Sequence, residues 1–348
     1  MNRNNVRICH LGCGHWGSNL IRNAAANPRI ELIALCDRDT AALKRIGDRY
    51  PGVTLCERVE EALHRWDVDA VIVATPSGLH YEHALAALEA GKHVFVEKPL
   101  ASSVAEACHL VAEAERAGRI LMTGHTFLYN NLVHEVKKRI DSGELGDIYY
   151  VYSQRLNLGR FRPDSDVLWT LAPHDISILN FWFESRPQQV SANGLNFIHR
   201  SANLAEVSFA QLSYPDGKEA HLHLSLLDPQ KSRRMVVVGS RKMLVYDDMN
   251  SDAHIQIYDK RAEVDHQSPI RDFADFTTRI RAGDLVIPPL RLVEPLSVEI
   301  DHFVSCVLDH KVPLTDGRHG IEVLAVLEAL SRSMVDNSHL TVEVVYPE

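Results

Sequence analysis

The first part of the chain alternates short apolar runs with segments in which apolar residues recur every three or four positions. Apolar runs of this length are typical of buried strands, and the longer spacing is typical of amphipathic helices. The predicted strands span residues 6–11, 31–36, 70–74, 93–96 and 120–123, and the predicted helices span 16–25, 40–50, 81–90 and 104–117. Gly91 and Gly118 follow two of these helices, where a left-handed helix end is expected. The alternation predicts an α/β domain with a doubly wound parallel sheet over residues 1–125.

The pattern changes after Gly124, and strands then dominate. A helix is predicted at 131–140, and strands are predicted at 148–154, 189–193, 206–214, 219–226, 234–238 and 242–246. Pro215, Asp216 and Gly217 are typical of a hairpin turn between two of these strands. Helices near 298–308 and 321–333 complete the pattern. We therefore predict a second domain, residues 126–348, of the α+β class with an antiparallel sheet.

Composition narrows the class of protein. With 348 residues the chain can form two domains, and its 45% hydrophobic and 24% charged residues are ordinary for a soluble globular protein. The net charge of −9 disfavours binding to nucleic acid, which depends on cationic side chains. No apolar run approaches the roughly 18 residues that span a bilayer, and the first residues lack the pattern of a secretory signal. Because the six cysteines are scattered in a way that suits reduced thiols, we expect a cytoplasmic protein.

Three glycines follow the first predicted strand and open the next helix, in the order Gly12, Gly14 and Gly17. Glycines at this spacing let the backbone approach a pyrophosphate, and the helix N-terminus attracts its negative charge. His15 and Trp16 lie inside the same loop, and we expect them to border the dinucleotide.

Asp37 ends the second predicted strand, about twenty residues after the last of these glycines, where such folds carry an acidic residue. A carboxylate there can accept hydrogen bonds from both ribose hydroxyls of the adenosine, and it would repel a 2′-phosphate. The sequence therefore predicts NAD as the cofactor in preference to NADP, a preference that the neighbouring Arg38 would soften. We expect no metal.

The predicted strands at 70–74 and 93–96 also end in residues that can contact a dinucleotide. Thr75 and Pro76 follow one strand, and His80 begins the next helix, so this turn would flank the nicotinamide ribose. For each of these side chains alone, an ordinary strand-to-helix loop explains the sequence equally well.

Glu97 and Lys98 close the strand at 93–96 and precede Pro99. A residue before proline is held extended, so a lysine at the carboxyl end of a buried strand is aimed in one direction. Its ammonium can donate a hydrogen bond to a substrate hydroxyl and stabilise the alkoxide that develops as hydride leaves carbon. A solvated lysine at a strand end remains the alternative for this residue alone. With the glycine loop, the pattern predicts a nicotinamide-dependent oxidoreductase.

These motifs, in this order, resemble the Gfo/Idh/MocA oxidoreductases, and the resemblance covers nearly the whole chain. The matching residues are the three glycines with Asp37, then Ala74-Thr75-Pro76, then Glu97-Lys98-Pro99, then His174-Asp175. The resemblance implies a Rossmann domain, a second domain with an open-faced antiparallel sheet, and NAD or NADP as cofactor. It also implies substrates that are mostly sugars, inositols or nucleotide-linked sugars. The family's catalytic lysine and histidine correspond to Lys98 and His174.

His174 follows Pro173 and is predicted to open an apolar helix. At a helix N-terminus the dipole disfavours the imidazolium and leaves a neutral base, although a capping role without catalysis is the alternative. Many relatives place an aspartate four residues before this histidine, where this chain has Thr170. Threonine can hydrogen-bond a hydroxyl but cannot be a base, so the proton must pass to His174 with Lys98, or to Asp175.

Two groups of cations are candidates for binding phosphate. They are Arg155, Arg160 and Arg162 around a glycine, and Lys231, Arg233 and Arg234 before a strand. Arginine forks suit a sugar diphosphate, whereas a solvated loop is the alternative for each arginine alone. The segment 130–174 looks most like the branch that acts on nucleotide-linked amino sugars, including UDP-N-acetylglucosamine 3-dehydrogenases. The resemblance thus implies oxidation of the 3-hydroxyl of such a sugar to a 3-keto sugar.

Other functions remain open at this point. The chain could oxidise a free sugar or an inositol, or it could be a regulator that binds NAD without turnover, in which Thr170 would be a sign of lost chemistry. An exposed sheet face in the second domain would favour self-association into a dimer or tetramer, because such faces are normally covered. His221 and His223 lie on one face of a predicted strand, where a polar sheet surface is a better interpretation than a metal pair.

Overall fold

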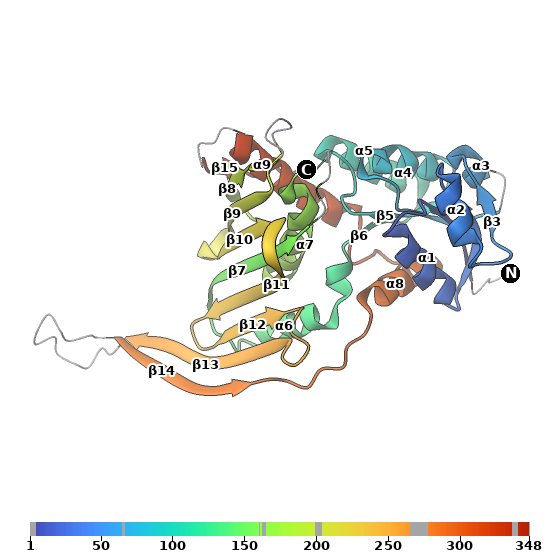
Figure 1. The fold of residues 1–348 in the computed structure, drawn as a ribbon. Coiled ribbons are helices and arrows are strands. Elements are labelled where there is room, and N and C mark those ends of the chain that lie inside the picture. Colours follow the sequence, from blue (N-terminus) through green and yellow to red (C-terminus); the bar gives the residue numbers. More distant parts are fainter. Residues whose placement is uncertain are drawn as a thin grey trace, which may run out of the picture. The chain divides into compact units, whose positions relative to one another are not determined.

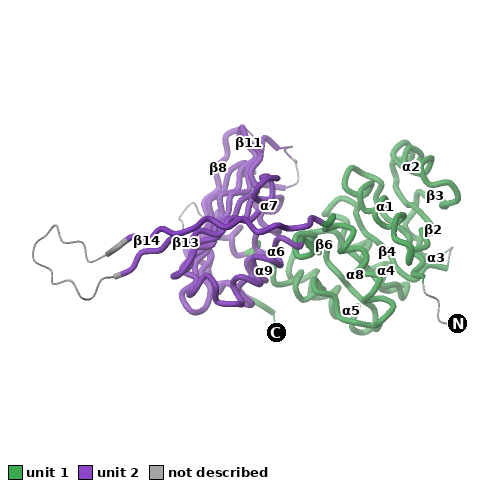
Figure 2. Tube along the Cα trace, turned by 90° about the horizontal axis from the view of Figure 1, so that it is seen from below, with its two compact units in different colours: residues 1–130, 293–328, 346–348 green, residues 131–292, 329–345 purple. Residues whose placement is uncertain are grey.

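The structure is a computed structural model that describes residues 5–64, 67–159, 161, 165–198, 204–264, 278–335 and 340–347. The chain forms two compact units (Figure 2). Unit 1 comprises Met1–Asn130, Val293–Glu328 and Tyr346–Glu348, and unit 2 comprises Asn131–Leu292 and Ala329–Val345. Residues 293–328, which the sequence analysis assigned to the second domain, therefore belong to unit 1.

Unit 1 is built on six parallel strands in the order β3-β2-β1-β4-β5-β6. They are β1 (Val6–Leu11), β2 (Ile30–Cys36), β3 (Thr54–Cys56), β4 (Ala70–Val73), β5 (His93–Glu97) and β6 (Leu121–Gly124). The strand order reverses at β1 and β4, and folds of this kind bind ligands beyond the carboxyl ends of the strands at that point. The predicted Rossmann sheet is confirmed.

Helices connect these strands and cover the sheet of unit 1 (Figure 1). They are α1 (Gly17–Ala26), α2 (Thr40–Gly47), α3 (Val59–His64), α4 (His80–Glu89), α5 (Val104–Ala117) and α8 (Pro295–Asp309), with the short turns η1 (Ser77–Leu79) and η2 (Thr126–Tyr129). Helix α9 (Gly317–Val335) contributes its first twelve residues to unit 1. Helix α8 packs its apolar side onto the sheet, and the rings of Phe303 and Phe95 meet edge to face at 5.8 Å.

Unit 2 contains a nine-stranded sheet in the order β14-β13-β12-β11-β7-β10-β9-β8-β15. Its strands are β7 (Ile148–Leu158), β8 (Gln189–Leu195), β9 (Val207–Ser213), β10 (Glu219–Ser225), β11 (Leu227–Gly239), β12 (Met243–Asp247), β13 (Ile255–Val264), β14 (Thr278–Val286) and β15 (Val342–Glu343). All neighbouring pairs are antiparallel except β7 with β10. The predicted turn at Pro215–Gly217 (η4) joins β9 to β10.

Two helices, α6 (Asn131–Asp141) and α7 (Val167–Phe183), cover one face of this sheet. Trp182 of α7 donates a hydrogen bond to the Val133 carbonyl of α6 at 3.0 Å and packs edge to face on Tyr246 of β12. Side chains alternate along each strand, so Tyr152 and Val236 point to the face opposite the helices. There they pack together in a small apolar cluster. Strands β13 and β14 continue outward as a long hairpin (Figure 1), which the sequence analysis did not predict.

Most predicted elements of both units exist, with ends that differ by a few residues. Gly91 and Gly118 adopt the positive φ angles, 70° and 62°, that end α4 and α5. Strand β3 and helix α3 were missed because each is very short. No helix in the described part of the chain is long and apolar enough to cross a membrane.

Candidate functional site

The glycine loop between β1 and α1 has little room for any side chain. Gly12 has φ +100°, and a Cβ there would lie 2.4 Å from the Ala74 carbonyl oxygen, while a Cβ on Gly17 would lie 2.1 Å from the Gly12 carbonyl oxygen. Gly14 differs, because a Cβ there would meet no atom within 4 Å. The loop is thus folded tightly against β4 and leaves open space at Gly14, which fits the approach of a pyrophosphate.

Asp37 lies at the end of β2 and is bonded to this loop. Its carboxylate accepts a hydrogen bond from the Cys13 backbone N–H at 2.6 Å and another from the Asp39 N–H at 2.8 Å. A carboxylate oxygen can accept more than one hydrogen bond, so the group stays competent to bind ribose hydroxyls while the backbone fixes its direction. The exposed Arg38 follows it directly.

His80 connects the ends of β4 and β5. One ring nitrogen, Nδ1, lies 2.7 Å from the Pro99 carbonyl oxygen, and Nε2 lies 2.9 Å from the Thr75 carbonyl oxygen. Burial lowers the pKa of His80, so the neutral ring donates to one of these carbonyls at a time. His80 therefore holds two loops of the predicted cofactor edge together, and Pro76 is exposed beside it.

Lys98 follows β5 at the carboxyl edge of the sheet, and the peptide bond between Lys98 and Pro99 is cis. Burial is the main cause of the lowered pKa of His80 and of His125, and the charge of Lys98 contributes to both. The charge of Lys98 therefore acts on both rings. Lys98 thus follows the last residue of β5 at the carboxyl edge of the sheet, and its contact with ligand stays a prediction.

Glu97, the residue before this lysine, is bonded to the glycine loop. The indole N–H of Trp16 donates to Glu97 Oε1, and the Lys98 backbone N–H donates to Oε2 at 3.2 Å. Burial raises the pKa of Glu97 to about 7, against the opposing effects of the Trp16 hydrogen bond and the Lys98 charge. Trp16 itself is 45% exposed, so the loop carries an indole that is held at one end and open to solvent at the other.

Sequence reasoning missed Glu299 of α8, which is fully buried in unit 1. Its Oε2 accepts a hydrogen bond from the Thr126 hydroxyl at 2.7 Å, and burial, together with the nearby Glu97, raises its pKa well above the usual value. A signal was present, because Glu299 lies among apolar residues in a helix whose other inward positions, such as Ile300 and Phe303, form the core.

In unit 2, His174 is not at a helix start, and that prediction is wrong. Helix α7 begins at Val167 with Asp166 as its N-cap, whose carboxylate accepts a hydrogen bond from the Trp169 N–H at 2.9 Å. Pro173 lies inside the helix, so His174 is two turns from the N-terminus and the dipole argument for a neutral base does not apply. Its side chain is partly exposed.

Thr170 lies one turn before this histidine on the same side of α7. Its hydroxyl donates to the Asp166 carbonyl oxygen at 2.7 Å and lies 3.3 Å from the Ser165 hydroxyl. The hydroxyl hydrogen of Thr170 is thus directed at the backbone, while the oxygen can still accept a hydrogen bond.

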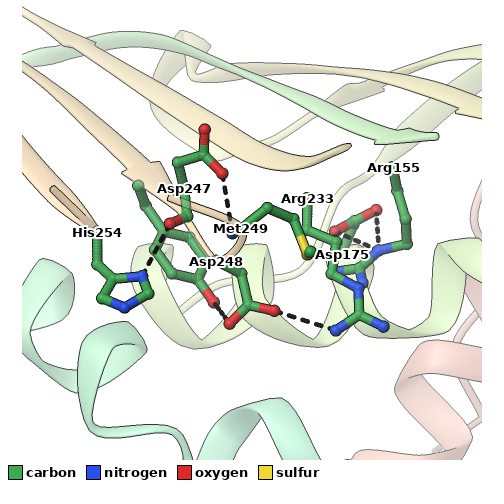
Figure 3. A network of polar contacts seen from close by, with 8 residues as sticks. Arg155, Asp175, Arg233, Asp247, Asp248, Met249 and His254 are labelled. Atoms are coloured by element: carbon green, nitrogen blue, oxygen red, sulfur yellow. Dashed lines mark hydrogen bonds and ion pairs between the residues drawn. The ribbon is translucent and has the colours of Figure 1, made fainter. Parts of the chain in front are cut away.

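Arg155 and Asp175 form an ion pair inside unit 2 (Figure 3). Arg155 Nη2 donates to Asp175 Oδ1 at 2.7 Å, and Nε lies 3.0 Å from Oδ2. The two side chains are only 7% and 1% exposed. The expectation that they contact substrate directly does not fit this burial, and the pair instead attaches α7, next to His174, to strand β7.

The other predicted cations lie elsewhere. Arg233 donates to Asp248 at 3.0 Å, Arg234 is half-buried opposite Asp247 in the β11–β12 ladder, and Lys231 is exposed. Arg160 and Arg162 lie outside the described residues.

The face of the unit 2 sheet opposite α6 and α7 contains a hollow of about 500 Å³. We call it the uncovered face, because no helix of the described residues packs on it. Its lining includes Tyr152, Gln154 and Phe209, and the Phe209 ring stacks on His223 at 4.4 Å. Across the described residues, no three His, Cys, Asp or Glu side chains gather in a way that could hold a metal ion.

Comparison with known proteins adds evidence that is independent of this geometry. Residues 6–125 match the oxidoreductase family with an NAD-binding Rossmann fold, and residues 133–245 match the GFO/IDH/MocA C-terminal domain. A 4-carboxy-2-hydroxymuconate-6-semialdehyde dehydrogenase from Sphingobium sp. is 30% identical over 228 residues, which are 63% of this chain and 72% of that protein.

Solved structures share the fold over almost the whole chain. The UDP-N-acetylglucosamine 3-dehydrogenase GnnA of Acidithiobacillus ferrooxidans superposes with a TM-score of 0.76 at 23% identity, covering 96% of this chain and 98% of that one. The WlbA dehydrogenase of Bordetella pertussis, solved with NADH and UDP-GlcNAcA, superposes with a TM-score of 0.78 at 22% identity, covering 99% and 100%. At these identities the likeness establishes the fold.

The two family matches follow the two units in order, and the amino-terminal match covers the tight glycine loop and the carboxylate bonded to it. The amino-terminal domain is therefore an NAD-binding Rossmann domain, as the sequence predicted, while the preference for NAD over NADP stays a prediction. The chain belongs to the GFO/IDH/MocA family of NAD-binding oxidoreductases.

Proposed function

We propose that this protein is an NAD-dependent dehydrogenase that oxidises a secondary hydroxyl of a sugar. The observation that supports this most directly is the connection between Lys98 and the glycine loop: Glu97, next to Lys98, accepts a hydrogen bond from Trp16 of that loop. The backbone of Lys98 is thereby fixed beside the glycine loop, at the edge where substrate and cofactor meet in folds of this kind.

The roles of the protein groups follow from their chemistry. NAD, when bound, supplies the acceptor for the hydride. Lys98 donates a hydrogen bond to the reacting oxygen and stabilises its developing negative charge. His174 accepts the hydroxyl proton, and Thr170 offers an oxygen that can accept a hydrogen bond from the sugar but cannot take its proton.

We propose a nucleotide-linked amino sugar as the substrate, oxidised at its 3-hydroxyl to a 3-keto sugar, as for UDP-N-acetylglucosamine. Two proteins with the same fold support this choice. One is a UDP-N-acetylglucosamine 3-dehydrogenase, and the other was solved with UDP-GlcNAcA. Lys231 is the cation of the described residues that we propose for the diphosphate, because Arg155 and Arg233 already pair with carboxylates. Arg234 shares the face of Val236, which is opposite α7 and His174, so we no longer assign it to substrate.

Absorbance at 340 nm tests the proposal directly. The protein is mixed with NAD and, in separate assays, with UDP-N-acetylglucosamine, its uronic acid, UDP-glucose, free hexoses and inositols. We expect NADH to form with a UDP-linked amino sugar. If NADH forms only with a free sugar or an inositol, that compound class is the substrate instead. NADH binding without turnover on any compound would favour a regulator.

Calorimetry with UDP tests the nucleotide part separately. In the presence of NADH, UDP should bind the wild-type protein, and Lys231→Gln should weaken UDP binding while leaving NADH affinity unchanged. Lys218→Gln is a matched control on the η4–β10 turn, and it should change neither affinity. No UDP binding at millimolar concentration would exclude a nucleotide sugar.

We also propose that copies of this chain associate through the uncovered face of the unit 2 sheet. This face exposes 40% of Tyr150 and 47% of Phe209, and large aromatic side chains on an open sheet are typical of an interface. Light scattering should give the mass of a dimer or tetramer, and Phe209→Glu should shift the protein to a smaller species. A monomeric wild-type protein at micromolar concentration would contradict this.

A further inference from the structure

Two carboxyl side chains are buried on the same face of the unit 1 sheet. Glu97, at the end of β5, is 7% exposed, and Glu299 of α8 is 0% exposed. Glu97 points to this face because it lies two residues after Phe95 on the same strand, and Phe95 packs on α8. Buried carboxyl groups are rare unless they are paired, so this arrangement requires an explanation.

Each carboxyl is only partly satisfied by hydrogen bonds. Glu97 accepts from the Trp16 indole and from the Lys98 backbone, whereas Glu299 accepts from Thr126 through Oε2, and its Oε1 has no hydrogen-bond partner in the described part of the chain. An Oε1 without a donor is more easily buried when Glu299 is a neutral carboxylic acid.

Among the described residues, the charged and titratable groups around the pair offer one cation. Lys98 adjoins Glu97 and favours its ionised form. The histidines of the neighbouring elements are neutral, because burial lowers the pKa of His10 on β1 to about 3 and of His319 on α9 to about 4, and lowers that of His125 after β6 well below its usual value. With one cation for two carboxyls, Glu97 can ionise while Glu299 stays protonated.

Glu97 also has little freedom to move. A Cβ on Gly124, its neighbour on β6, would lie 3.1 Å from Glu97 Cδ and 3.2 Å from Oε1. The carboxyl is therefore confined between β6, Trp16 and the backbone of Lys98. Its charge acts on a fixed set of partners, of which Trp16 belongs to the glycine loop.

We propose that Glu97 and Glu299 form a buried acid pair that holds one proton when Glu97 is ionised, and that ionised Glu97 is a positioning residue for NAD, fixing the glycine loop through Trp16. The proposal requires the NAD-binding loop but not the sugar substrate. Glu299 supplies the neutral neighbour that allows Glu97 to carry its charge in the interior. When Glu97 gains a proton, its bond to Trp16 weakens and the loop is held less firmly.

The expected effect is a pH dependence of cofactor binding. A hydrogen bond to a charged acceptor is about twice as strong as one to a neutral acceptor, which corresponds to about fivefold in affinity. Because the pKa of Glu97 is about 7, NADH should bind about fivefold more tightly at pH 8 than at pH 6. The dinucleotide phosphates are fully ionised across this range and contribute no transition.

Calorimetric titration of NADH between pH 5.5 and 8.5 tests the proposal. Glu97→Gln retains an amide oxygen for Trp16 but cannot ionise, so its NADH affinity should not change with pH. Trp16→Phe removes the partner of the carboxylate at a half-exposed position that tolerates substitution, and it should lose the transition as well. Glu299→Gln keeps a neutral acceptor for Thr126 and should retain the transition, which makes it the matched control.

His15 lies exposed in the same loop, so His15→Gln serves as the second control and should also retain the transition. A wild-type protein whose NADH affinity does not change across this range would overturn the proposal. A transition that persists in Trp16→Phe, or that disappears in His15→Gln, would do the same, even if Glu97→Gln does not fold. Failure to oxidise any sugar would leave these measurements unaffected, so the two proposals can fail separately.

Discussion

Arg155 of β7 and Asp175 of α7 face each other inside unit 2, with the guanidinium Nη2 2.7 Å from the carboxylate Oδ1. Removing one member of such a buried pair leaves a charge without its partner. Arg155→Met should therefore lower the free energy of unfolding by about 3 to 5 kcal/mol, and Arg155→Met with Asp175→Leu should recover most of it. Urea unfolding measures both changes.

Arg233 provides the control for that comparison. It pairs with Asp248, but its side chain is 36% exposed, so Arg233→Gln should cost at most about 1 kcal/mol. If Arg155→Met cost no more than Arg233→Gln, the pair would not hold α7 to the sheet. A substrate contact for Arg155 would then have to be reconsidered.

The three glycines of the loop should respond differently to alanine. Gly12→Ala and Gly17→Ala place a Cβ within 2.4 Å of a carbonyl oxygen, so both variants should be severely destabilised. Gly14→Ala meets no atom within 4 Å and should fold normally, but its methyl group would occupy space needed by the pyrophosphate and weaken NADH binding. Thermal unfolding and NADH calorimetry separate the two effects. Unchanged NADH affinity in Gly14→Ala would contradict the placement of the pyrophosphate.

Asp37 should control the choice between NAD and NADP. Asp37→Ser removes a charged acceptor of ribose hydroxyls, each such bond being worth about 1.5 to 3 kcal/mol, and it also removes repulsion of a 2′-phosphate. The Kd for NADH should rise much more than that for NADPH. Asp39→Asn removes a charge two residues away but keeps the cap of α2, so it should leave selectivity unchanged. If wild type and Asp37→Ser showed the same selectivity for NADH over NADPH, Asp37 would not be the residue that binds the ribose hydroxyls.

Lys98 and His174 should matter far more for turnover than for cofactor binding. Lys98→Met should lower kcat by about a hundredfold to a thousandfold, and His174→Ala by about a hundredfold to ten-thousandfold, while both retain NADH binding. Adding Thr170→Asp to His174→Ala should restore some activity at alkaline pH, because it places a carboxylate one turn earlier on the same side of α7. Near-normal kcat in His174→Ala would show that another group accepts the hydroxyl proton.

His10 should contribute to acid denaturation of the protein. Burial lowers its pKa from 6.5 to about 3, so below pH 6.5 the unfolded chain binds a proton that the folded protein does not. Its contribution to stability is therefore present above about pH 6.5 and is lost as the pH falls toward 3, by about 1.4 kcal/mol for each unit of pKa shift. His10→Leu should flatten the dependence of unfolding free energy on pH between 6.5 and 4. An unchanged slope would contradict the burial of a neutral ring.

The features that could be predicted from the sequence are those encoded locally. The glycine loop, Asp37 and Lys98 were located correctly at strand ends because each is a short motif next to an apolar run. Helix α7 was misjudged because Pro173 resembles a first-turn proline, whereas the helix begins at Val167 and accommodates the proline internally.

Other features depend on distant parts of the chain. The sequence places Glu299 among the apolar positions of an amphipathic helix, but only the packing of α8 onto the sheet shows that Glu97 is its neighbour. Arg155 likewise resembles a phosphate ligand in the sequence, because no local pattern shows that it pairs with Asp175 on α7. No local pattern indicates that residues 293–328 return to unit 1.

The discontinuous composition of unit 1 affects how the protein can fold during its synthesis. All six strands of its sheet have been made by Gly124, but α8, which packs against Phe95 on one face, begins only at Pro295. The ribosome adds about 5 to 20 residues per second, so roughly 10 to 30 s pass between the two. During that interval the apolar face of the nascent sheet lacks its covering helix, and unit 2 is translated in the meantime. We expect newly made chains to depend on chaperones in this window, and fragments that end before α8 to aggregate.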